Sequence, residues 1–518
     1  MATIDFTTYF ANLHNWQGDL LNAGGGDASW NGHGTDMTVT LGASSPFAGY
    51  VISIIGTGFN YVNNIPVEGD MTGLTITDKD GHTVLSVSGL APGSLASDFS
   101  LFWSNAFGYD TPGGHSGSQW MNAWSNLMSG NDVFNGTSGS DYRGLVGHDG
   151  GNDVYNMLAG DDYVNGSMGS DTINGGDGFD TYAFGLTTEI VGAGISQGIT
   201  VRMDLHTVVD CWGFTDHVFD VEFFIGSVTR DTFYGNDVEN RFAGLRGNDV
   251  FYGGGGNDWV VYDQDASFGG MFGVTADLRV GIGSAGAPAH ATDGFGNTDQ
   301  LYSIENIAGT RFDDVFIGAK GQNNFAGGEG KDSYNGGGGA DWIFFSWRFS
   351  DQAQTGIVVD LTRATGRIQN DGYGNVEEAV SIENINGSDQ SDRIKGSAGQ
   401  NWITGMDGAD TMTGAGGADF FQFEQLSQFG DGDVITDFHA GAGANQDRLQ
   451  IFTSNWGAST DLHLVNGTHA TEAVGSFVYR QFNHTLYWDD DGTGSDAMVA
   501  VCVLKGVAAL TAANFDLV

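Results

Sequence analysis

Acidic side chains recur at a fixed nine-residue interval through much of the chain. Residues 226–261 divide into the nonapeptides GSVTRDTFY, GNDVENRFA, GLRGNDVFY and GGGGNDWVV, and residues 309–344 and 387–422 divide in the same way. In all three tracts the sixth position reads Asp, Asn, Asp, Asp. A less regular tract covers 127–185, with three extra residues around His148. Oxygen atoms of carboxylates and carbonyls are the ligands that Ca²⁺ takes in proteins. The candidate calcium ligands are Asp132, Asp141, Asp153, Asp162, Asp171, Asp180, Asp231, Asn240, Asp249, Asp258, Asp314, Asn323, Asp332, Asp341, Asp392, Asn401, Asp410 and Asp419.

The composition of each nonapeptide predicts how these side chains are positioned. The first six residues are rich in glycine, which adopts positive φ at little cost and lets backbone carbonyls point at an ion. The last three residues form a short strand whose middle side chain points to the core while its neighbours face out. The residues expected in the core are Phe233, Phe251, Val260, Phe316, Ile343, Ile403, Met412 and Phe421.

Two nonapeptides are expected to complete one turn of a flattened coil, so that residues 18 apart stack on the same edge with calcium between them. An Asn offers a carbonyl oxygen but no charge, and we therefore expect the pairs that contain Asn to bind calcium more weakly. The predicted partners are Asp153 with Asp171, Asp162 with Asp180, Asp231 with Asp249, Asn240 with Asp258, Asp314 with Asp332, Asn323 with Asp341, Asp392 with Asp410, and Asn401 with Asp419.

A longer repeat lies between the tracts. The segments GITVRMDL at 198, GVTADLRV at 273 and GIVVDLTR at 356 carry a strand signature, and each spacer closes on VEFFIG, IENIAG or IENING just before the next tract. We therefore expect three units of about 80 residues, laid end to end as a solenoid. A flexible glycine-rich linker is the alternative, but a linker has no reason to keep an apolar residue at one phase of a strict period.

The charge of the chain excludes several classes of partner. Among 518 residues, 64 are Asp or Glu and 18 are Lys or Arg, a net charge of −46, so nucleic acid and anionic membrane surfaces are not expected ligands. The 40% of hydrophobic residues indicates a chain that folds once cations neutralise its carboxylates. We expect no membrane span, because no stretch approaches the length of an apolar transmembrane helix. The start MATIDFTTYFANLHNW lacks the basic and apolar regions of a cleaved signal peptide, and Cys211 and Cys502 are expected to be buried free thiols.

The tracts resemble the repeat-in-toxin (RTX) family, whose GGxGxDxUx turns stack into a parallel β-roll that binds Ca²⁺. This resemblance implies an all-β fold, a parallel β-roll or β-helix solenoid of RTX repeats, with about eight to ten calcium ions. The last residues, LTAANFDLV, resemble the uncleaved signal read by type I secretion machinery, which implies a secreted bacterial protein. The first turn of each tract, such as GSVTRDTFY or GSDQSDRIK, lacks the inner glycines, which puts its full coordination in doubt.

These patterns divide the chain into six segments. They are a β-rich domain with a helical cap over 1–126, a first RTX tract over 127–185, three segments that each join a strand region to a tract (186–262, 263–345 and 346–425), and a capping and secretion-signal region over 426–518.

The first of these segments lacks the nonapeptide. Strands are expected in DMTVTLG, AGYVISIIGTGFNYV and MTGLTITDKDGHTVLSVSGL, with a turn at Asp80-Gly81. Two short helices are expected around Leu95–Trp103 and Trp120–Met128, whose apolar residues follow the helical spacing. These aromatic side chains could form a sugar-binding platform, although core packing and a cap over the open edge of the solenoid are favoured.

The last segment contains two further acidic groups. Asp489, Asp491 and Gly494 match the first, third and sixth positions of an EF-hand loop, but Ala500 stands where the twelfth position requires Glu. A hairpin turn between LYW and MVAV is therefore the preferred interpretation. Asp433, Asp437 and Asp447 could ligate another calcium ion, or could be solvated acids of turns.

Two of the catalytic motifs that we sought, the zinc-protease motif HExxH and the phosphate loop GxxxxGK[ST], are absent. GHSGS at 114–118 has Ser in place of the last glycine of a GxSxG elbow, and GISQG at 194–198 matches the spacing of that elbow but lies directly before an expected strand rather than a helix. His14, His33, His82 and His115 share the N-terminal segment with several carboxylates, but their spacing selects no reaction. An enzyme is therefore the less favoured alternative, and no catalytic residue is assigned.

The favoured hypothesis is a calcium-folded protein, secreted by a type I apparatus, with a structural role in a surface layer, filament, biofilm matrix or adhesive coat. Self-association or binding to surface and matrix glycans would be its interactions. The alternatives are a glycan-binding lectin or adhesin, with Trp30, Trp103 and Trp120 as candidate contacts, and a calcium-dependent secreted enzyme. In both alternatives the site would lie in the N-terminal segment.

Overall fold

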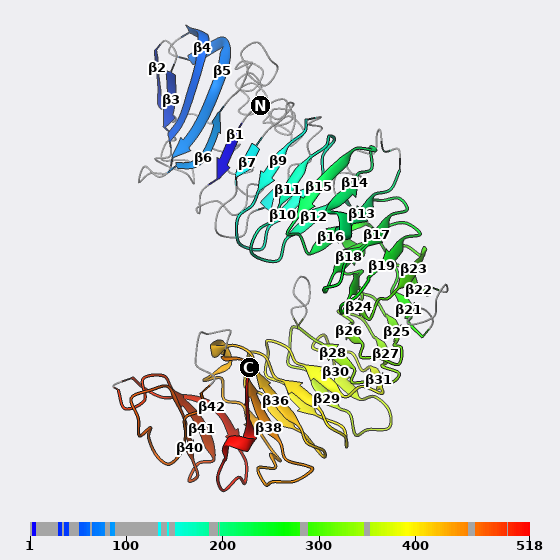
Figure 1. Cartoon of the computed structure of the whole chain (residues 1–518), viewed down its shortest axis with the longest axis vertical. Helices are drawn as coiled ribbons and strands as arrows, with labels where there is room; N and C mark the ends of the chain where they lie inside the picture. The colour runs from blue at the N-terminus through cyan, green and yellow to red at the C-terminus, as the bar shows by residue number, and fades with distance from the viewer. Residues whose placement is uncertain are drawn as a thin grey trace. The chain divides into compact units, whose positions relative to one another are not determined.

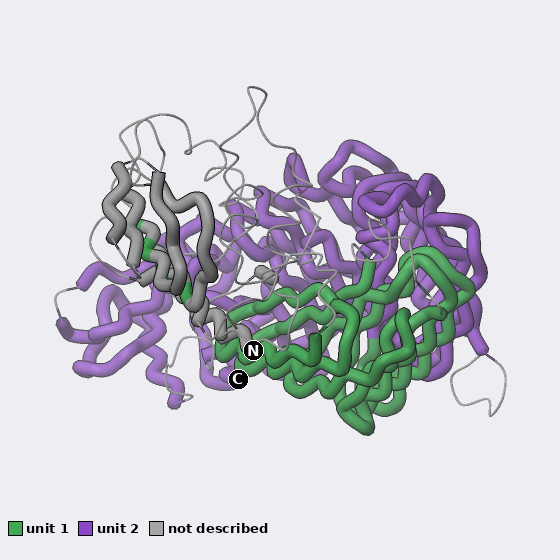
Figure 2. The backbone as a smooth tube through the Cα atoms, turned by 90° about the horizontal axis from the view of Figure 1, so that it is seen from above, with its two compact units in different colours: residues 1–258 green, residues 259–518 purple. Residues whose placement is uncertain are grey.

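A computed structural model describes residues 151–185, 195, 197–279, 288–346, 353–453, 461–494 and 496–518, and before residue 151 the strands β1 to β8. The chain forms two compact units, Met1–Asp258 and Trp259–Val518 (Figure 2). Asp132, Asp141, the expected turn at Asp80-Gly81 and the two expected helices lie outside the described residues. The six-segment division of the chain therefore stays a prediction.

Each nonapeptide forms a turn followed by a three-residue strand, and strands 18 residues apart pair in parallel (Figure 1). In unit 1 the repeat strands are β9 (Val154–Asn156), β10 (Tyr163–Asn165), β11 (Thr172–Asn174), β12 (Thr181–Ala183), β17 (Thr232–Tyr234), β18 (Arg241–Ala243) and β19 (Val250–Tyr252). In unit 2 they are β20 (Trp259–Val261), β25 (Val315–Ile317), β26 (Asn324–Ala326), β27 (Ser333–Asn335), β28 (Trp342–Phe344), β33 (Arg393–Lys395), β34 (Trp402–Thr404), β35 (Thr411–Thr413) and β36 (Phe420–Phe423). Successive nonapeptides alternate between two sheets, which is the arrangement of a parallel β-roll.

The core lies between the two sheets of the roll. All eight residues predicted to point inward are fully buried, with a relative exposure of 0%. Aromatic rings of the core stack from turn to turn. The ring centroids of Phe233 and Phe251 lie 4.9 Å apart, and the angle between the ring planes is 7°. Burial and offset stacking of aromatic rings together stabilise the coil along its axis.

The prediction that both neighbours of each core residue face out is wrong for part of the roll. In β20, Trp259 and Val261 flank Val260 and are themselves 3% and 2% exposed. Trp259 packs edge-on against Phe344, with the ring centroids 6.0 Å apart. The side chains on both faces of β20 are thus buried and this strand does not show the expected alternation, whereas β28 of the same sheet does.

The three spacers begin with the predicted strands β13 (Thr200–Arg202), β21 (Thr275–Asp277) and β29 (Val358–Asp360). Each of these strands continues the parallel ladder of the next tract and also pairs antiparallel with a following strand: β14 (Thr207–Val209), β22 (Ala289–Thr292) or β30 (Ile368–Asn370). The chain then returns through β15 (Thr215–Phe219), β23 (Thr298–Tyr302) or β31 (Glu378–Val380). A spacer is therefore a small meander. It re-enters the roll through a last strand, β16 (Phe223–Ile225), β24 (Asn306–Ala308) or β32 (Asn384–Asn386).

The N-terminal strands of unit 1 form an antiparallel sheet. The predicted strands are present as β3 (Asp36–Thr40), β4 (Val51–Val62), β5 (Ile65–Thr77) and β6 (Thr83–Ser88), with β2 (Ser29–His33) beside β3. The first strand, β1 (Thr3–Phe6), pairs antiparallel with β6 and parallel with β7 (Val133–Asn135), which in turn pairs with β9. The antiparallel sheet is therefore hydrogen-bonded to the first tract within one unit.

The last strands of unit 2 extend both sheets of its roll. β37 (Val434–Ile435) pairs with β42 (Val499–Leu504), and β38 (Arg448–Ile451) pairs with β43 (Phe515–Leu517). The hairpin predicted near residue 489 is confirmed, since β41 (Thr485–Asp489) and β42 are antiparallel neighbours. The segment LTAANFDLV contributes the 3-10 helix η5 (Ala512–Asn514) and β43, and Asn514 is fully buried.

Candidate calcium sites

The sixth-position residues of stacked turns are joined in one repeated way. In each of the eight predicted pairs, the backbone N–H of the earlier residue donates a hydrogen bond of 2.7–2.9 Å to Oδ1 of the residue 18 positions later. All of these side chains are 2% exposed or less. The structure thus brings together the sixteen described candidates in the pairs that the period predicts.

The first-position glycine of each turn makes room for the acidic side chain. A Cβ built on Gly226, Gly309 or Gly405 would lie 2.1–2.3 Å from Oδ2 of the aspartate five residues later in the same turn. Any other residue would displace that carboxylate, because non-bonded atoms do not approach so closely. Glycine at this position is therefore needed for space rather than for an unusual backbone angle.

Backbone carbonyls of one turn face the carboxylate of the next. A Cβ on Gly247 would lie 2.2 Å from Oδ1 of Asp249 and 2.8 Å from the carbonyl oxygen of Thr229, which is 18 residues earlier than Gly247. Oxygen atoms of two stacked turns therefore converge on one place. A site made only of carboxylate and carbonyl oxygens fits a hard cation such as Ca²⁺ better than a thiophilic metal.

The electrostatics of the turns also fit a cation. Oδ2 of Asp180, Asp341 and Asp410 is buried without a hydrogen-bond partner. Burial raises the pKa of these carboxyl groups to about 6, about 7 and about 8, respectively. Repulsion from neighbouring carboxylates, Glu222, Glu383 and Asp433, contributes to these raised pKa values. A bound divalent ion would reverse both effects, since it favours the charged form of each carboxylate.

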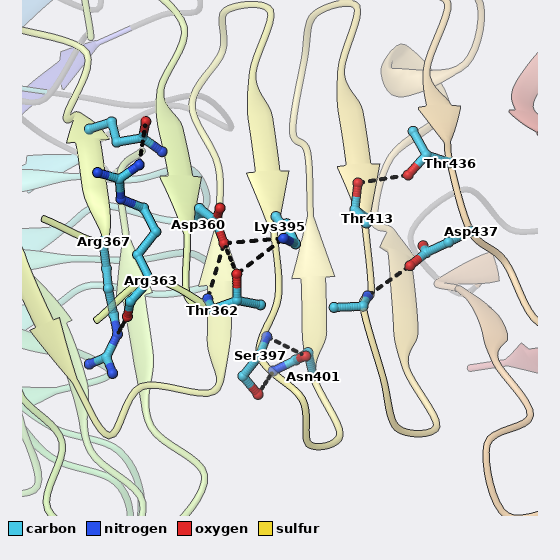
Figure 3. A network of polar contacts seen from close by, with 12 residues as sticks. Asp360, Thr362, Arg363, Arg367, Lys395, Ser397, Asn401, Thr413, Thr436 and Asp437 are labelled. Carbon is cyan, nitrogen blue, oxygen red and sulfur yellow. Dashed lines mark hydrogen bonds and ion pairs between the residues drawn. The ribbon is translucent and has the colours of Figure 1, made fainter. Parts of the chain in front are cut away.

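Several basic side chains of the described residues pair with acids on the outside of the roll. Lys395 Nζ lies 3.6 Å from Asp360 Oδ1 on neighbouring strands, whereas Asn401 lies in the turn beyond the strands (Figure 3). Arg202 pairs with Asp204, and Arg279 with Asp277, in the same exposed manner. These exposed ion pairs do not supply positive charge to the interior of the turns.

The side-chain amide of the asparagine in each tract donates a hydrogen bond, which an aspartate in its place could not do. The side-chain amides of Asn323 and Asn401 donate to the backbone carbonyls of Glu305 and Glu383, 18 residues earlier in the preceding spacer. Asn240 instead donates within its own turn, to Oδ1 of Asn236. The turn below Asn323 or Asn401 belongs to a spacer, and the amide satisfies a carbonyl that a carboxylate would repel.

The first aspartate of each regular tract is held by protein donors. Oδ2 of Asp231, Asp314 and Asp392 accepts the backbone N–H of the second turn residue at 2.7 Å. Oδ1 accepts the hydroxyl of that same residue, Ser227, Thr310 or Ser388, at 2.7–3.1 Å. A backbone N–H of the spacer, from Ile199, Val274 or Ile357, also donates to Oδ1. These three carboxylates therefore anchor a spacer to its tract, in the turns that lack the inner glycines.

Six acids of the spacers and of the last segment continue the same hydrogen-bonding pattern, and we name them the closing acids. The last sixth-position aspartates of three tracts donate their backbone N–H at 2.8–3.1 Å to these carboxylates. The pairs are Asp171 with Asp216, Asp180 with Glu222, Asp332 with Glu377, Asp341 with Glu383, Asp410 with Asp433, and Asp419 with Asp447. The four spacer acids are not among the ligands predicted from the nine-residue period. A signal exists, since an Asp or Glu stands six residues before the Glu of each spacer ending VEFFIG, IENIAG or IENING.

Among the described residues, one further acidic group has the compactness of a metal site. Carboxylate oxygens of Asp489, Asp490 and Asp491 lie within 4.8 Å of one another at the end of β41.

The other acids considered in the last segment are Asp433, Asp437 and Asp447. Asp433 and Asp447 are buried. Oδ1 and Oδ2 of Asp437, which is labelled in Figure 3, accept the backbone N–H groups of Gly414 and Ala415. Cys211 and Cys502 are buried and form no disulfide, as predicted.

A parallel β-roll with stacked acidic turns defines a class of cation-binding solenoid. Comparison with protein families finds matches to one family, the RTX calcium-binding nonapeptide repeat (4 copies). The matched residues are 128–142, 149–182, 226–268, 308–343 and 386–421. These five segments of the chain therefore carry RTX calcium-binding nonapeptide repeats. No curated protein matches the chain in sequence. None of the helices in the described part of the chain has the length and apolar character needed to cross a membrane.

Proposed function

We propose that this protein is secreted, folds on calcium outside the cell and serves a structural role at a surface or in an extracellular matrix. The observation that carries the proposal is the column of buried aspartates joined at 18-residue intervals, with carboxyl pKa values raised by burial and by one another. In the cation-free chain this column opposes folding, because burying several carboxylates in one interior costs more than their hydrogen bonds return.

The sixteen described sixth-position residues would hold the ions together with carbonyls of the stacked turns, and Asp132 and Asp141 remain candidates from the sequence alone. Calcium supplies the positive charge that the basic side chains of these turns do not. Coupling of binding to folding then makes the folded state depend on the surrounding calcium concentration. A cytosol poor in free calcium would keep the chain unfolded for export, and about 10⁻⁴ to 10⁻³ M calcium outside would fold it.

The structural role is favoured over an enzyme or a lectin because the nonapeptide tracts and their spacers make up most of the described residues. The test is far-ultraviolet circular dichroism of the purified chain in chelator and in millimolar calcium, followed by electron microscopy of the calcium sample. A β-sheet signal that grows with calcium and the appearance of sheets or filaments are expected. An equal β-sheet signal in chelator would refute calcium-driven folding, and dispersed monomers in calcium would refute assembly.

A further inference from the structure

The buried closing acid Glu377 occupies the place of a calcium ligand without belonging to a nonapeptide. The backbone N–H of Asp314 donates to Oδ1 of Asp332 at 2.8 Å, and that of Asp332 donates to Oε1 of Glu377 at 3.0 Å. The same bond therefore continues from the last turn of the tract into the spacer. Glu377 stands where the sixth-position aspartate of one more turn would stand.

The second oxygen of Glu377 has no protein partner. Glu377 is 1% exposed and its Oε2 is buried without a hydrogen bond, beside Asp332, which is 2% exposed. Oδ2 of Asp332 accepts only a long bond of 3.3 Å from the hydroxyl of Tyr334. A buried carboxylate oxygen with no donor raises the free energy of the folded state, and a bound cation would lower it.

The loop before Glu377 satisfies the hydrogen bonding of its own aspartate. Oδ1 of Asp371 accepts the backbone N–H groups of Tyr373, Gly374 and Asn375 at 2.8–2.9 Å. Its Oδ2 accepts the side-chain amide of Asn375 at 2.9 Å. Asp371 is thus satisfied by its own turn, which leaves Glu377 and Asp332 as the open carboxylates of this region.

We propose that Asp332 and Glu377 form an additional calcium site, at the seam between the tract 309–344 and the spacer that follows it. The site rests on the proposed calcium-dependent folding, but its ligand set differs from that of the repeats, because the spacer supplies a glutamate in place of a sixth-position aspartate. One carboxylate from each side of the seam supplies negative charge, and Oε2 of Glu377 is an oxygen ligand that no hydrogen bond occupies, as Ca²⁺ requires.

The test counts ions on the full-length chain by native mass spectrometry in calcium-containing buffer. Glu377→Gln keeps the shape and the oxygen that accepts the Asp332 N–H but removes the charge, and it should bind one calcium ion fewer than the unsubstituted chain. Glu378→Gln is the matched control, since this neighbouring side chain is exposed and bonds to Gly366 N–H, and it should keep the full number. An unchanged count in Glu377→Gln would overturn the seam site. A chain that binds no calcium at all would instead refute the proposed function.

A second measurement covers the case in which Glu377→Gln fails to fold. Tb³⁺ replaces Ca²⁺ in oxygen sites and emits when a nearby tyrosine is excited, and the Tyr334 hydroxyl bonds to Asp332. Tyr334→Phe leaves both carboxylates in place, so it should lower the tyrosine-excited Tb³⁺ emission while the calcium count stays unchanged. Emission equal to that of the unsubstituted chain would overturn the proposal.

Discussion

The side-chain amide of Asn323 donates a 2.7 Å hydrogen bond to the backbone carbonyl of Glu305, 18 residues earlier. Its Oδ1 accepts the backbone N–H of Ala319 at the same distance, so the fully buried side chain is satisfied at both ends. The carbonyl below it belongs to a spacer rather than to a nonapeptide. In two of the three regular tracts, the asparagine in the recurring order Asp, Asn, Asp, Asp therefore bonds to the spacer on which its turn stacks.

We predict that Asn323→Asp destabilises the roll instead of creating a stronger calcium site. A carboxylate would face the Glu305 carbonyl with no donor between them, and the loss of one buried hydrogen bond costs about 1–3 kcal/mol. Thermal unfolding at saturating calcium, together with an ion count, measures the effect. A higher melting temperature with one additional ion would contradict this explanation of the asparagine.

Two adjacent glycines of one turn should respond differently to the same substitution. Gly339 has φ of +143°, and a Cβ there would lie 2.5 Å from the carbonyl oxygen of Gly321 in the turn below. We expect Gly339→Ala to lower the free energy of unfolding by more than the ~1–2 kcal/mol of the backbone angle alone, and to weaken calcium binding. Both effects can be read from calcium titrations followed by circular dichroism.

Gly338 is the control for that comparison. A Cβ on Gly338 would meet no atom within 4 Å. Gly338→Ala should therefore leave the calcium midpoint unchanged. If the two variants behaved alike, the close stacking of turns would not explain why Gly339 is glycine.

The period of the sequence was sufficient to predict the roll, because every turn repeats one local arrangement. The pairs Asp314 with Asp332 and Asp392 with Asp410, and the buried Phe316, follow directly from the nine-residue phase. The closing acids could not be found in this way. Glu377 lies 45 residues after the aspartate whose backbone N–H it accepts, and Asp433 lies 23 residues after its own. These separations differ because they depend on the length of each intervening segment.

Other features depend on what stacks against a residue rather than on its own position. Asn323 was expected to be a weaker calcium ligand, but its amide bonds to a spacer carbonyl that no nonapeptide pattern could indicate. Trp259 was expected to face out, but it is 3% exposed and its ring packs edge-on against Phe344, 85 residues later in the chain. Both cases required knowledge of a non-local neighbour.

The inward and outward residues of strand β25 should differ strongly in their contribution to stability. Phe316 is fully buried and stacks on Phe325, with centroids 5.5 Å apart and an interplanar angle of 6°. Phe316→Ala should cost about 3–5 kcal/mol, from lost apolar burial and the cavity that remains. Val315, the preceding residue, is 39% exposed, and Val315→Ala should change stability by no more than about 0.5 kcal/mol. Urea unfolding in saturating calcium compares them, and similar costs would contradict the assignment of the core.

Acid should favour the folded roll when calcium is absent. Burial raises the pKa of Asp180 to about 6, of Asp341 to about 7 and of Asp410 to about 8, whereas the pKa of each in the unfolded chain is near 3.8. The folded state therefore binds protons more tightly, and its stability declines as the pH rises from about 4 through about 8. In chelator, we expect the β-sheet signal in circular dichroism to increase when the pH is lowered from 8 to 5.

Saturating calcium should reverse this dependence. The bound ion favours the charged carboxylates, so protons compete with it and the melting temperature should fall as the pH is lowered over the same range. Asp410→Asn offers a matched test, because it removes one titrating group and one charge at a turn that retains its hydrogen-bond acceptor. This variant should reduce the gain in chelator at low pH and weaken calcium binding at pH 8. If chelated and calcium-saturated chains responded to pH in the same direction, the buried aspartates would not be what couples calcium to folding.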